Sequence, residues 1–198
     1  MTYSDFTLPL AVNRFGLTLD MKSDLFSPVE ERDPSNLLRE TLAYNTTLAL
    51  SIATEKARSE LLVSPILTEA RRVRDDKVNL FSGNVFNVDA TVGLAGYFDF
   101  LLTHSPYLSV VQAPVFAVVE AKKEDVTTGY GQCVATMVGA QRFNAQSNEP
   151  IETVYGAVTS GDIWKFLSLR GTDVRVDRET YYLDRIERLL GVLWRVTE

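Results

Sequence analysis

Two charged residues, Glu120 and Lys122, stand where an apolar run ends. Residues Val115 to Val119 form a short, mostly β-branched and uninterrupted run, and Pro114 precedes it. This pattern predicts a strand that is buried on both faces. Because alternate residues of a strand share a face, we expect Glu120 and Lys122 to point the same way. A carboxylate and an ammonium group at the edge of a core are costly unless they pair or serve a site.

A third polar residue, Asp99, interrupts the apolar run of residues 96–102. Asp is disfavoured inside strands, so its presence there needs a reason. If the two predicted strands are neighbours, Asp99, Glu120 and Lys122 meet at one place. Two carboxylates beside a lysine form a hard-oxygen site for Mg²⁺ with a cation next to it. The alternative is structural, with Glu120 paired to Lys122 and Asp99 capping a turn.

The elements that must position these residues follow from the order of patterns along the chain. Two helices, three strands, a helix, further strands and a closing helix indicate an α/β sandwich around a mixed sheet. Asp33 and Pro34 predict the start of the first helix, and Pro65 predicts a kink or break in the second. The predicted helices cover about residues 36–51, 54–74, 130–143 and 183–196, and the predicted strands about residues 79–89, 97–103, 115–122, 152–159, 163–169 and 174–176.

In these residues the chain resembles the PD-(D/E)XK nuclease superfamily. The signature of that family is an Asp on one strand of a hairpin, Glu-x-Lys on the next strand, and often a Gln on the helix that follows. The matching residues here are Asp99, Glu120-Ala121-Lys122 and Gln132, within a resemblance that covers roughly residues 54–166. The Pro that usually precedes the Asp is replaced by Phe98. Glu-x-Lys alone is expected about once by chance in a chain of this size, so the surrounding strands and helix carry the match.

The resemblance implies a restriction endonuclease-like α/β/α sandwich and a phosphodiester hydrolysis that depends on Mg²⁺ or Mn²⁺. It implies that Asp99, Glu120 and the backbone carbonyl of Ala121 bind the metal. Lys122 would position or activate the attacking water and stabilise the charge of the transition state. The Gln132 amide would orient a phosphate or that water; the alternative is a simple exposed helix residue.

The family commonly places a further Glu on its first core helix, near the metal. On a helix over residues 54–74, at about 100° per residue, Glu55 falls on the apolar face and Glu60 near its edge. We prefer Glu55 for this role and keep Glu60. The alternative for each is a surface salt bridge to Lys56 or Arg58.

Length and composition fit a single domain over residues 1–198. Residues 1–32 are expected to form an arm packed on the core, residues 54–166 a nuclease-like core, and residues 167–198 an elaboration of β-turns and a helix. The single cysteine, Cys133, excludes an internal disulfide and is expected to be a buried structural thiol.

The net charge of −6 argues against a broad nucleic-acid interface, which needs a basic face. A local basic patch remains compatible with a nuclease. The candidates form two groups, which are Arg71, Arg72, Arg74 and Lys77, and separately Lys122, Lys123 and Arg142. The only histidine, His104, lies in a predicted loop and is not expected to act as a base or a ligand.

The N-terminal residues lack the pattern of a signal peptide, and no apolar run reaches membrane-spanning length, so we expect a cytoplasmic protein that does not enter the membrane. The expected partner is nucleic acid, with DNA preferred over RNA, and a homodimer would suit cleavage of two strands. The rival hypothesis is a non-catalytic nucleic-acid-binding or structural domain on the same fold, because fold does not imply function. The rival is favoured if the carboxylates of Asp99 and Glu120 diverge.

Overall fold

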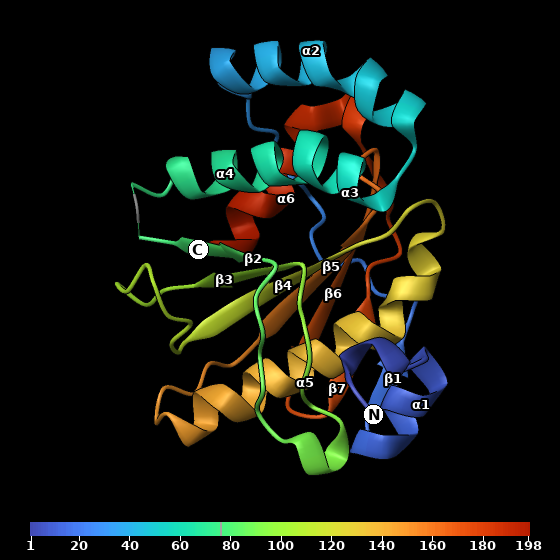
Figure 1. Ribbon diagram of the computed structural model, residues 1–198, viewed down its shortest axis with the longest axis vertical. Coiled ribbons are helices and arrows are strands. Elements are labelled where there is room, and N and C mark those ends of the chain that lie inside the picture. The colour runs from blue at the N-terminus through green and yellow to red at the C-terminus, as the bar shows by residue number, and fades with distance from the viewer. Residues whose placement is uncertain (76) are drawn as a thin grey trace.

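The computed structural model describes residues 1–75 and 77–198. It shows an α/β protein in which helices cover both faces of one mixed sheet (Figure 1). The helices are α1 (Leu8–Phe15), α2 (Asn36–Ile52), α3 (Glu55–Arg58), α4 (Ser64–Arg72), α5 (Tyr130–Gln146) and α6 (Ile186–Val196). On one side of the sheet lie α3, α4 and α6, with α2 packed outside α3 and α4, and on the other side lie α1 and α5 (Figure 1). The α/β class and the mixed sheet flanked by helices are therefore as predicted.

The strands are β1 (Thr18–Asp20), β2 (Asn79–Ser82), β3 (Phe100–Thr103), β4 (Val115–Ala121), β5 (Val154–Thr159), β6 (Ile163–Arg170), β7 (Asp173–Val176) and β8 (Tyr181–Tyr182). Their order in the sheet is β1-β7-β6-β5-β4-β3-β2, and β8 pairs with β6 off this path. Strands β2, β3 and β4 form an antiparallel meander. Helix α5 then leads to β5, which lies parallel to β4. The remaining pairs in the path are antiparallel, except that β1 is parallel to β7.

The central strand β4 is buried along its whole length, which agrees with its continuous apolar sequence. Its side chains are divided between two cores, and from Ala117 onward they alternate between them. Val118 packs with Leu101 against α5, whereas Val119 and Phe100 pack on the face that α4 covers. Glu120 and Lys122 share the parity of Val118, so the strand directs both toward the α5 layer.

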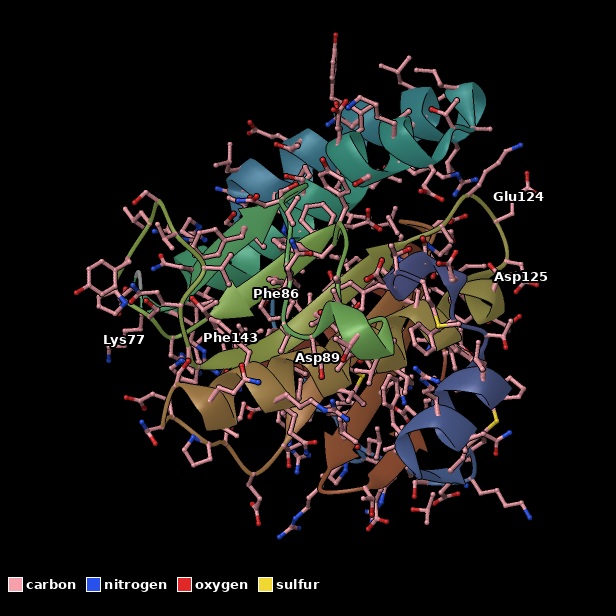
Figure 2. All side chains as sticks on the ribbon, turned by 60° about the horizontal axis from the view of Figure 1, so that its bottom comes forward. Lys77, Phe86, Asp89, Glu124, Asp125 and Phe143 are labelled. Carbon is pink, nitrogen blue, oxygen red and sulfur yellow. The ribbon has the colours of Figure 1, made fainter. Side chains whose placement is uncertain are left out.

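Between β2 and β3 the chain leaves the sheet and crosses α5 (Figure 1). Phe86 of this excursion packs edge-on against Phe143 of α5, at a centroid distance of 5.2 Å (Figure 2). The predicted strands at residues 79–89 and 97–103 are therefore shorter than expected. Only residues 79–82 and 100–103 stay in the sheet, because the intervening residues cover the helix instead.

Residues 1–32 contribute more to the fold than the predicted arm. Helix α1, which the sequence pattern did not predict, packs against α5, and β1 extends the sheet beside β7. Tyr3, Phe6 and Ala11 are buried in the core on the α5 side. This close packing requires Gly131 in α5, since a Cβ there would lie 2.2 Å from the carbonyl oxygen of Phe6.

The structure changes the predicted cap of the first helix and defines the irregularity that was predicted near Pro65 in the second. The N-cap of α2 is Ser35 rather than Asp33, and its hydroxyl accepts a hydrogen bond from the Leu38 amide at 3.2 Å. The irregularity expected at Pro65 takes the form of a π-helical turn at Ser59–Val63, directly before α4 begins at Ser64, and the chain stays helical without a break. The carbonyl of Leu61, which a non-proline residue 65 would bond, instead accepts a hydrogen bond from Asn45 of α2 at 3.1 Å.

Cys133 is a buried free thiol, as predicted. Within residues 1–75 and 77–198, no helix combines the length and apolar character needed to cross a membrane.

Candidate active site

Asp99 lies directly before β3 and not within it, so the predicted strand over residues 97–103 is regular only from Phe100. Its backbone still follows β2, because its carbonyl accepts a hydrogen bond from the Gly83 amide at 2.9 Å. Its side chain turns toward β4 and accepts a hydrogen bond from the Ala121 amide at 2.7 Å. This bond fixes the Asp99 carboxylate against the end of the central strand.

Glu120 is completely buried at the end of β4, between β3 and β5. One carboxyl oxygen, Oε2, accepts a hydrogen bond from the Gln132 amide at 2.7 Å. The other, Oε1, lies 3.3 Å from the Thr136 hydroxyl. Burial raises the pKa of Glu120 well above its usual range, and the negative charge of Asp99 and a hydrogen bond between the two carboxyl groups raise it further, against the opposing effect of Lys122. Asp99 and Glu120 therefore converge.

Lys122 follows β4 directly, and its backbone amide bonds the carbonyl of Thr159 on β5 at 2.7 Å. Its ammonium group donates to the Ala121 carbonyl at 2.9 Å and to the Gln132 side-chain carbonyl at 3.2 Å. Gly129, just before α5, makes room for this side chain. A Cβ at Gly129 would lie 2.5 Å from Val158 and 3.1 Å from two carbons of Lys122.

Gln132, in the first turn of α5, connects the two charged residues of the Glu-x-Lys pair. Its nitrogen faces Glu120 and its oxygen faces Lys122, so the orientation of the amide is defined at both ends. The structure therefore places Asp99, Glu120, Lys122 and Gln132 together on the α5 side of the sheet.

Glu55 and Glu60 are not part of this cluster. Both side chains are exposed, and Glu60 pairs with Lys56 at 2.9 Å. No hydrogen bond or ion pair within the described residues joins either one to Asp99, Glu120 or Lys122. The prediction that Glu55 lies on the apolar face is wrong, because the π-helical turn at Ser59–Val63 changes the angular spacing that a regular helix would have. For Glu60 the structure shows the alternative, a surface salt bridge.

The arginines of the first basic group are largely committed to structural contacts. Arg72 binds Glu69 through two hydrogen bonds, and Arg74 stacks on Trp194 at 3.9 Å and bonds the Thr197 hydroxyl. Glu124 lies on the loop that follows Lys122, and Lys77 lies on the opposite side of the molecule from it (Figure 2). The two predicted basic groups therefore do not combine into one surface.

The second basic group is also interrupted by acidic residues. Arg142 pairs with Asp89 at 3.4 Å, and Lys123 lies 3.7 Å from Glu124. Glu124 and Asp125 project outward from the loop between β4 and α5 (Figure 2). Lys122 is thus the member of this group that faces the candidate site.

His104 lies at the opposite end of β3 and β4 from Glu120. Its ring stacks on Phe116 at 4.1 Å, which gives it a packing role. His104 is therefore not part of the cluster around Glu120.

Sequence reasoning missed two residues around Glu120. Thr136 lies one helical turn after Gln132, and this i, i+4 spacing was a usable signal. Tyr3 had no such signal, because it comes from the N-terminal segment. Its buried hydroxyl lies against Gly139 of α5 and has no hydrogen-bond partner among the described residues. Burial and the charge of Glu120 raise the pKa of Tyr3.

The atoms that could hold a metal ion here are the carboxyl oxygens of Asp99 and Glu120 and the carbonyl oxygen of Ala121. In the described parts of the chain, no group of three or more His, Cys, Asp and Glu residues is arranged to hold a metal. Two carboxylates suit Mg²⁺, which usually keeps several waters and takes further oxygens from a phosphate substrate.

Comparisons with known proteins add no relative, since no protein family, no characterised sequence and no solved structure matches this chain. The functional argument therefore rests on the geometry of the site.

Proposed function

We propose that this protein is a metal-dependent nuclease that hydrolyses phosphodiester bonds of nucleic acid. The observation that carries the proposal is the convergence of Asp99 and Glu120 at the ends of two neighbouring strands, with Lys122 beside them. A completely buried carboxylate beside a second, partly buried carboxylate and an ammonium group is costly to maintain without a use. Catalysis would provide that use.

The order of elements supports a restriction endonuclease-like arrangement. An antiparallel meander of β2, β3 and β4 carries Asp99 and the Glu-x-Lys residues, α5 follows with Gln132, and β5 lies parallel to β4. The resemblance expects this same order. It also expects a carboxylate from the first core helix, and neither Glu55 nor Glu60 supplies one.

The donor set fits a hard divalent cation such as Mg²⁺ or Mn²⁺, because all candidate ligand atoms are oxygens. Asp99, Glu120 and the Ala121 carbonyl would hold the ion. When bound, it would neutralise phosphate charge and lower the pKa of a water molecule. Glu120 must lose its proton to take part, so ion binding is expected to release protons and to strengthen as the pH rises.

Lys122 is the residue placed to act on the substrate. Its ammonium group is within one hydrogen bond of both the Ala121 carbonyl and Gln132. From the end of β4, beside Asp99 and Glu120, this side chain would orient the attacking water and stabilise the negative charge that develops on the phosphate oxygens. Gln132 would orient the same water or a phosphate oxygen.

A cleavage assay tests the proposal on labelled single- and double-stranded DNA and RNA, with Mg²⁺ or Mn²⁺. We expect cutting by the wild type, no cutting by Glu120→Ala, and retained cation binding with at least a hundredfold slower cutting by Lys122→Met, on the order of the loss of one transition-state contact. Glu60→Ala is the matched control, because Glu60 is exposed and pairs only with surface Lys56. Loss of cutting in the control variant alone would place the active site elsewhere.

The second candidate is a non-catalytic nucleic-acid-binding or structural domain on the same fold. The net charge of −6 and the engagement of Arg72 and Arg74 in internal contacts favour the structural form of this candidate, because they leave less basic surface for nucleic acid. Binding of labelled DNA without cutting, in the presence of either cation, would support this candidate. DNA remains the expected partner in both cases. A homodimer is the expected assembly for cutting two strands, and sedimentation equilibrium measures it.

A further inference from the structure

The side chains of Gln132 and Lys122 donate hydrogen bonds to two of the oxygen atoms that the proposed function assigns to the metal ion. Gln132 donates to Glu120 Oε2 at 2.7 Å, and Lys122 donates to the Ala121 carbonyl at 2.9 Å. A third hydrogen bond of 3.2 Å joins the Lys122 ammonium to the Gln132 carbonyl oxygen. The two side chains therefore form one connected chain of donors across two candidate ligand atoms.

This arrangement conflicts with a bound cation for electrostatic reasons. A divalent cation on the Ala121 carbonyl would lie within a few ångströms of the Lys122 ammonium, and like charges at such distances repel strongly. An amide N–H group that points at Glu120 Oε2 likewise presents positive charge to the oxygen that the cation requires. Each of these oxygens has a second lone pair, but the ion and the two donors compete for the same negative charge, so ion binding is expected to displace both donors.

The surroundings allow side-chain movement while the backbone stays in place. Gln132 and Lys122 are both only partly buried, so their ends have solvent on one side. By contrast, the start of α5 is fixed, because Gly131 contacts the backbone of Phe6 and Thr7 closely. Release is thus expected to be a rotation of two side chains, without a shift of the helix.

We propose that Gln132 and Lys122 form a latch, defined by their three hydrogen bonds to each other, to Glu120 and to Ala121, which a divalent cation opens as it binds. Opening the latch removes Lys122 from the Ala121 carbonyl and leaves its ammonium group available to the substrate. Metal binding and the release of the Lys122 ammonium group then occur together. This inference rests on the proposed function, since it assumes that Asp99 and Glu120 hold the ion.

The latch makes an unusual prediction, which is that removing a polar residue from the site strengthens ion binding. In Gln132→Ala the cation no longer competes with the amide for Glu120. We expect Mn²⁺ to bind on the order of fivefold more tightly, the value of about one net hydrogen bond. Isothermal titration of the protein with Mn²⁺ measures the affinity. Gln146→Ala, which changes an exposed glutamine in the last turn of the same helix, should match the wild type.

A second measurement follows Lys122 directly. Amine-reactive labelling, read by mass spectrometry, should modify Lys122 faster when Mn²⁺ is added. Lys123 is the internal control, because its side chain is exposed and should react at the same rate with or without the ion. Circular dichroism of each variant confirms that it is folded before the ion is added.

The possible outcomes distinguish a failure of the latch from a failure of the proposed metal site. Tighter Mn²⁺ binding in Gln132→Ala, with faster labelling of Lys122 on addition of Mn²⁺, supports the latch. Binding that is unchanged or weaker in Gln132→Ala, while Glu120→Ala abolishes it, overturns the latch and leaves the metal site standing. Labelling of Lys122 that Mn²⁺ does not accelerate also overturns it. No Mn²⁺ binding in the wild type or in Gln132→Ala overturns both the latch and the proposed metal site.

Discussion

At the scale of single residues, the candidate site is arranged at the expense of stability. Glu120 has no solvent exposure and lies beside Asp99. Folding therefore favours its protonated form, and the raised pKa expresses that preference. The neighbouring Thr136, Gln132 and Lys122 contribute polar contacts but do not reverse it. Buried groups whose pKa is shifted in this way concentrate at functional sites.

The cost appears as a pH dependence of stability. The folded state raises the pKa of Glu120. The contribution of this group to the free energy of unfolding is therefore fully present below its ordinary pKa of 4.5, and it is lost as the pH rises toward the pKa in the folded state. Glu120→Gln, which mimics the protonated form, should therefore unfold at a higher temperature than the wild type at pH 7. The gain should be a few degrees, since about 1 kcal/mol shifts Tm by about 2–4 °C in a domain of this size.

Thermal unfolding in EDTA at pH 7 and at pH 4 measures this difference. The gap between the two proteins should shrink at pH 4, where the unfolded wild type also binds the proton. Equal gaps at both pH values would show that Glu120 does not titrate differently in the folded state.

At the scale of elements, one buried carboxylate joins two helices. Glu69 of α4 accepts hydrogen bonds from the amide and the hydroxyl of Ser35, the N-cap residue of α2. It also accepts two hydrogen bonds from Arg72 on its own helix. Although burial raises the pKa of Glu69, these hydrogen bonds from Arg72 and Ser35 outweigh it and leave the pKa below its ordinary value. Glu69 thus has a structural role that the sequence pattern did not reveal.

The change Glu69→Gln tests that role. We expect a loss of about 1–3 kcal/mol in the free energy of unfolding at pH 7, the range for removing charge-assisted hydrogen bonds. A lowered pKa stabilises the folded state above the ordinary value of 4.5 and loses that effect as the pH falls through the folded pKa. Urea denaturation at pH 7 and near pH 3 should therefore show a large difference from wild type at pH 7 and a small one in acid.

Glu60→Gln is the matched control for Glu69→Gln, because Glu60 lies on the same helical segment with an exposed side chain. Its surface ion pair is expected to contribute at most about 1 kcal/mol. A similar loss of stability in both variants would contradict the special role of Glu69.

At the scale of the whole molecule, the N-terminal segment completes the fold. Tyr3 and Phe6 are buried against α5 and the excursion between β2 and β3, and β1 closes the edge of the sheet beside β7. The Tyr3 hydroxyl lies against Gly139 of α5, about one helical turn after Thr136, which contacts Glu120. The segment therefore links the far edge of the sheet to the layer that supports Gln132.

Deletion of residues 1–20 should lower Tm by well over 10 °C. Burial of a single large apolar side chain contributes about 1.5–3 kcal/mol, and the deletion removes several. Circular dichroism measures the unfolding temperature. Deletion of residues 1–2 alone, which spares Tyr3 and Phe6, is the control and should have a much smaller effect. If the protein without residues 1–20 unfolded at the same temperature as the full-length protein, the segment would be an arm that does not stabilise the fold.

The sequence by itself determined the α/β class, the mixed sheet with helices on both sides, and the buried strand that ends at Glu120. Local patterns were sufficient there, because β4 is buried on both faces and its composition records that burial. The i, i+2 spacing also placed Glu120 and Lys122 on one face, since strand geometry leaves no other arrangement. The nuclease function itself stays a proposal.

Only the tertiary structure decided which other residues join them. Whether Asp99 meets Glu120 depends on the pairing of β3 with β4. The contacts of Gln132 depend on how closely the start of α5 approaches Val158 and Lys122, an approach that Gly129 allows. The packing that brings Tyr3 against α5 arises from contacts between distant segments. Such contacts leave no period in the local sequence, so a pattern of adjacent residues could not predict them.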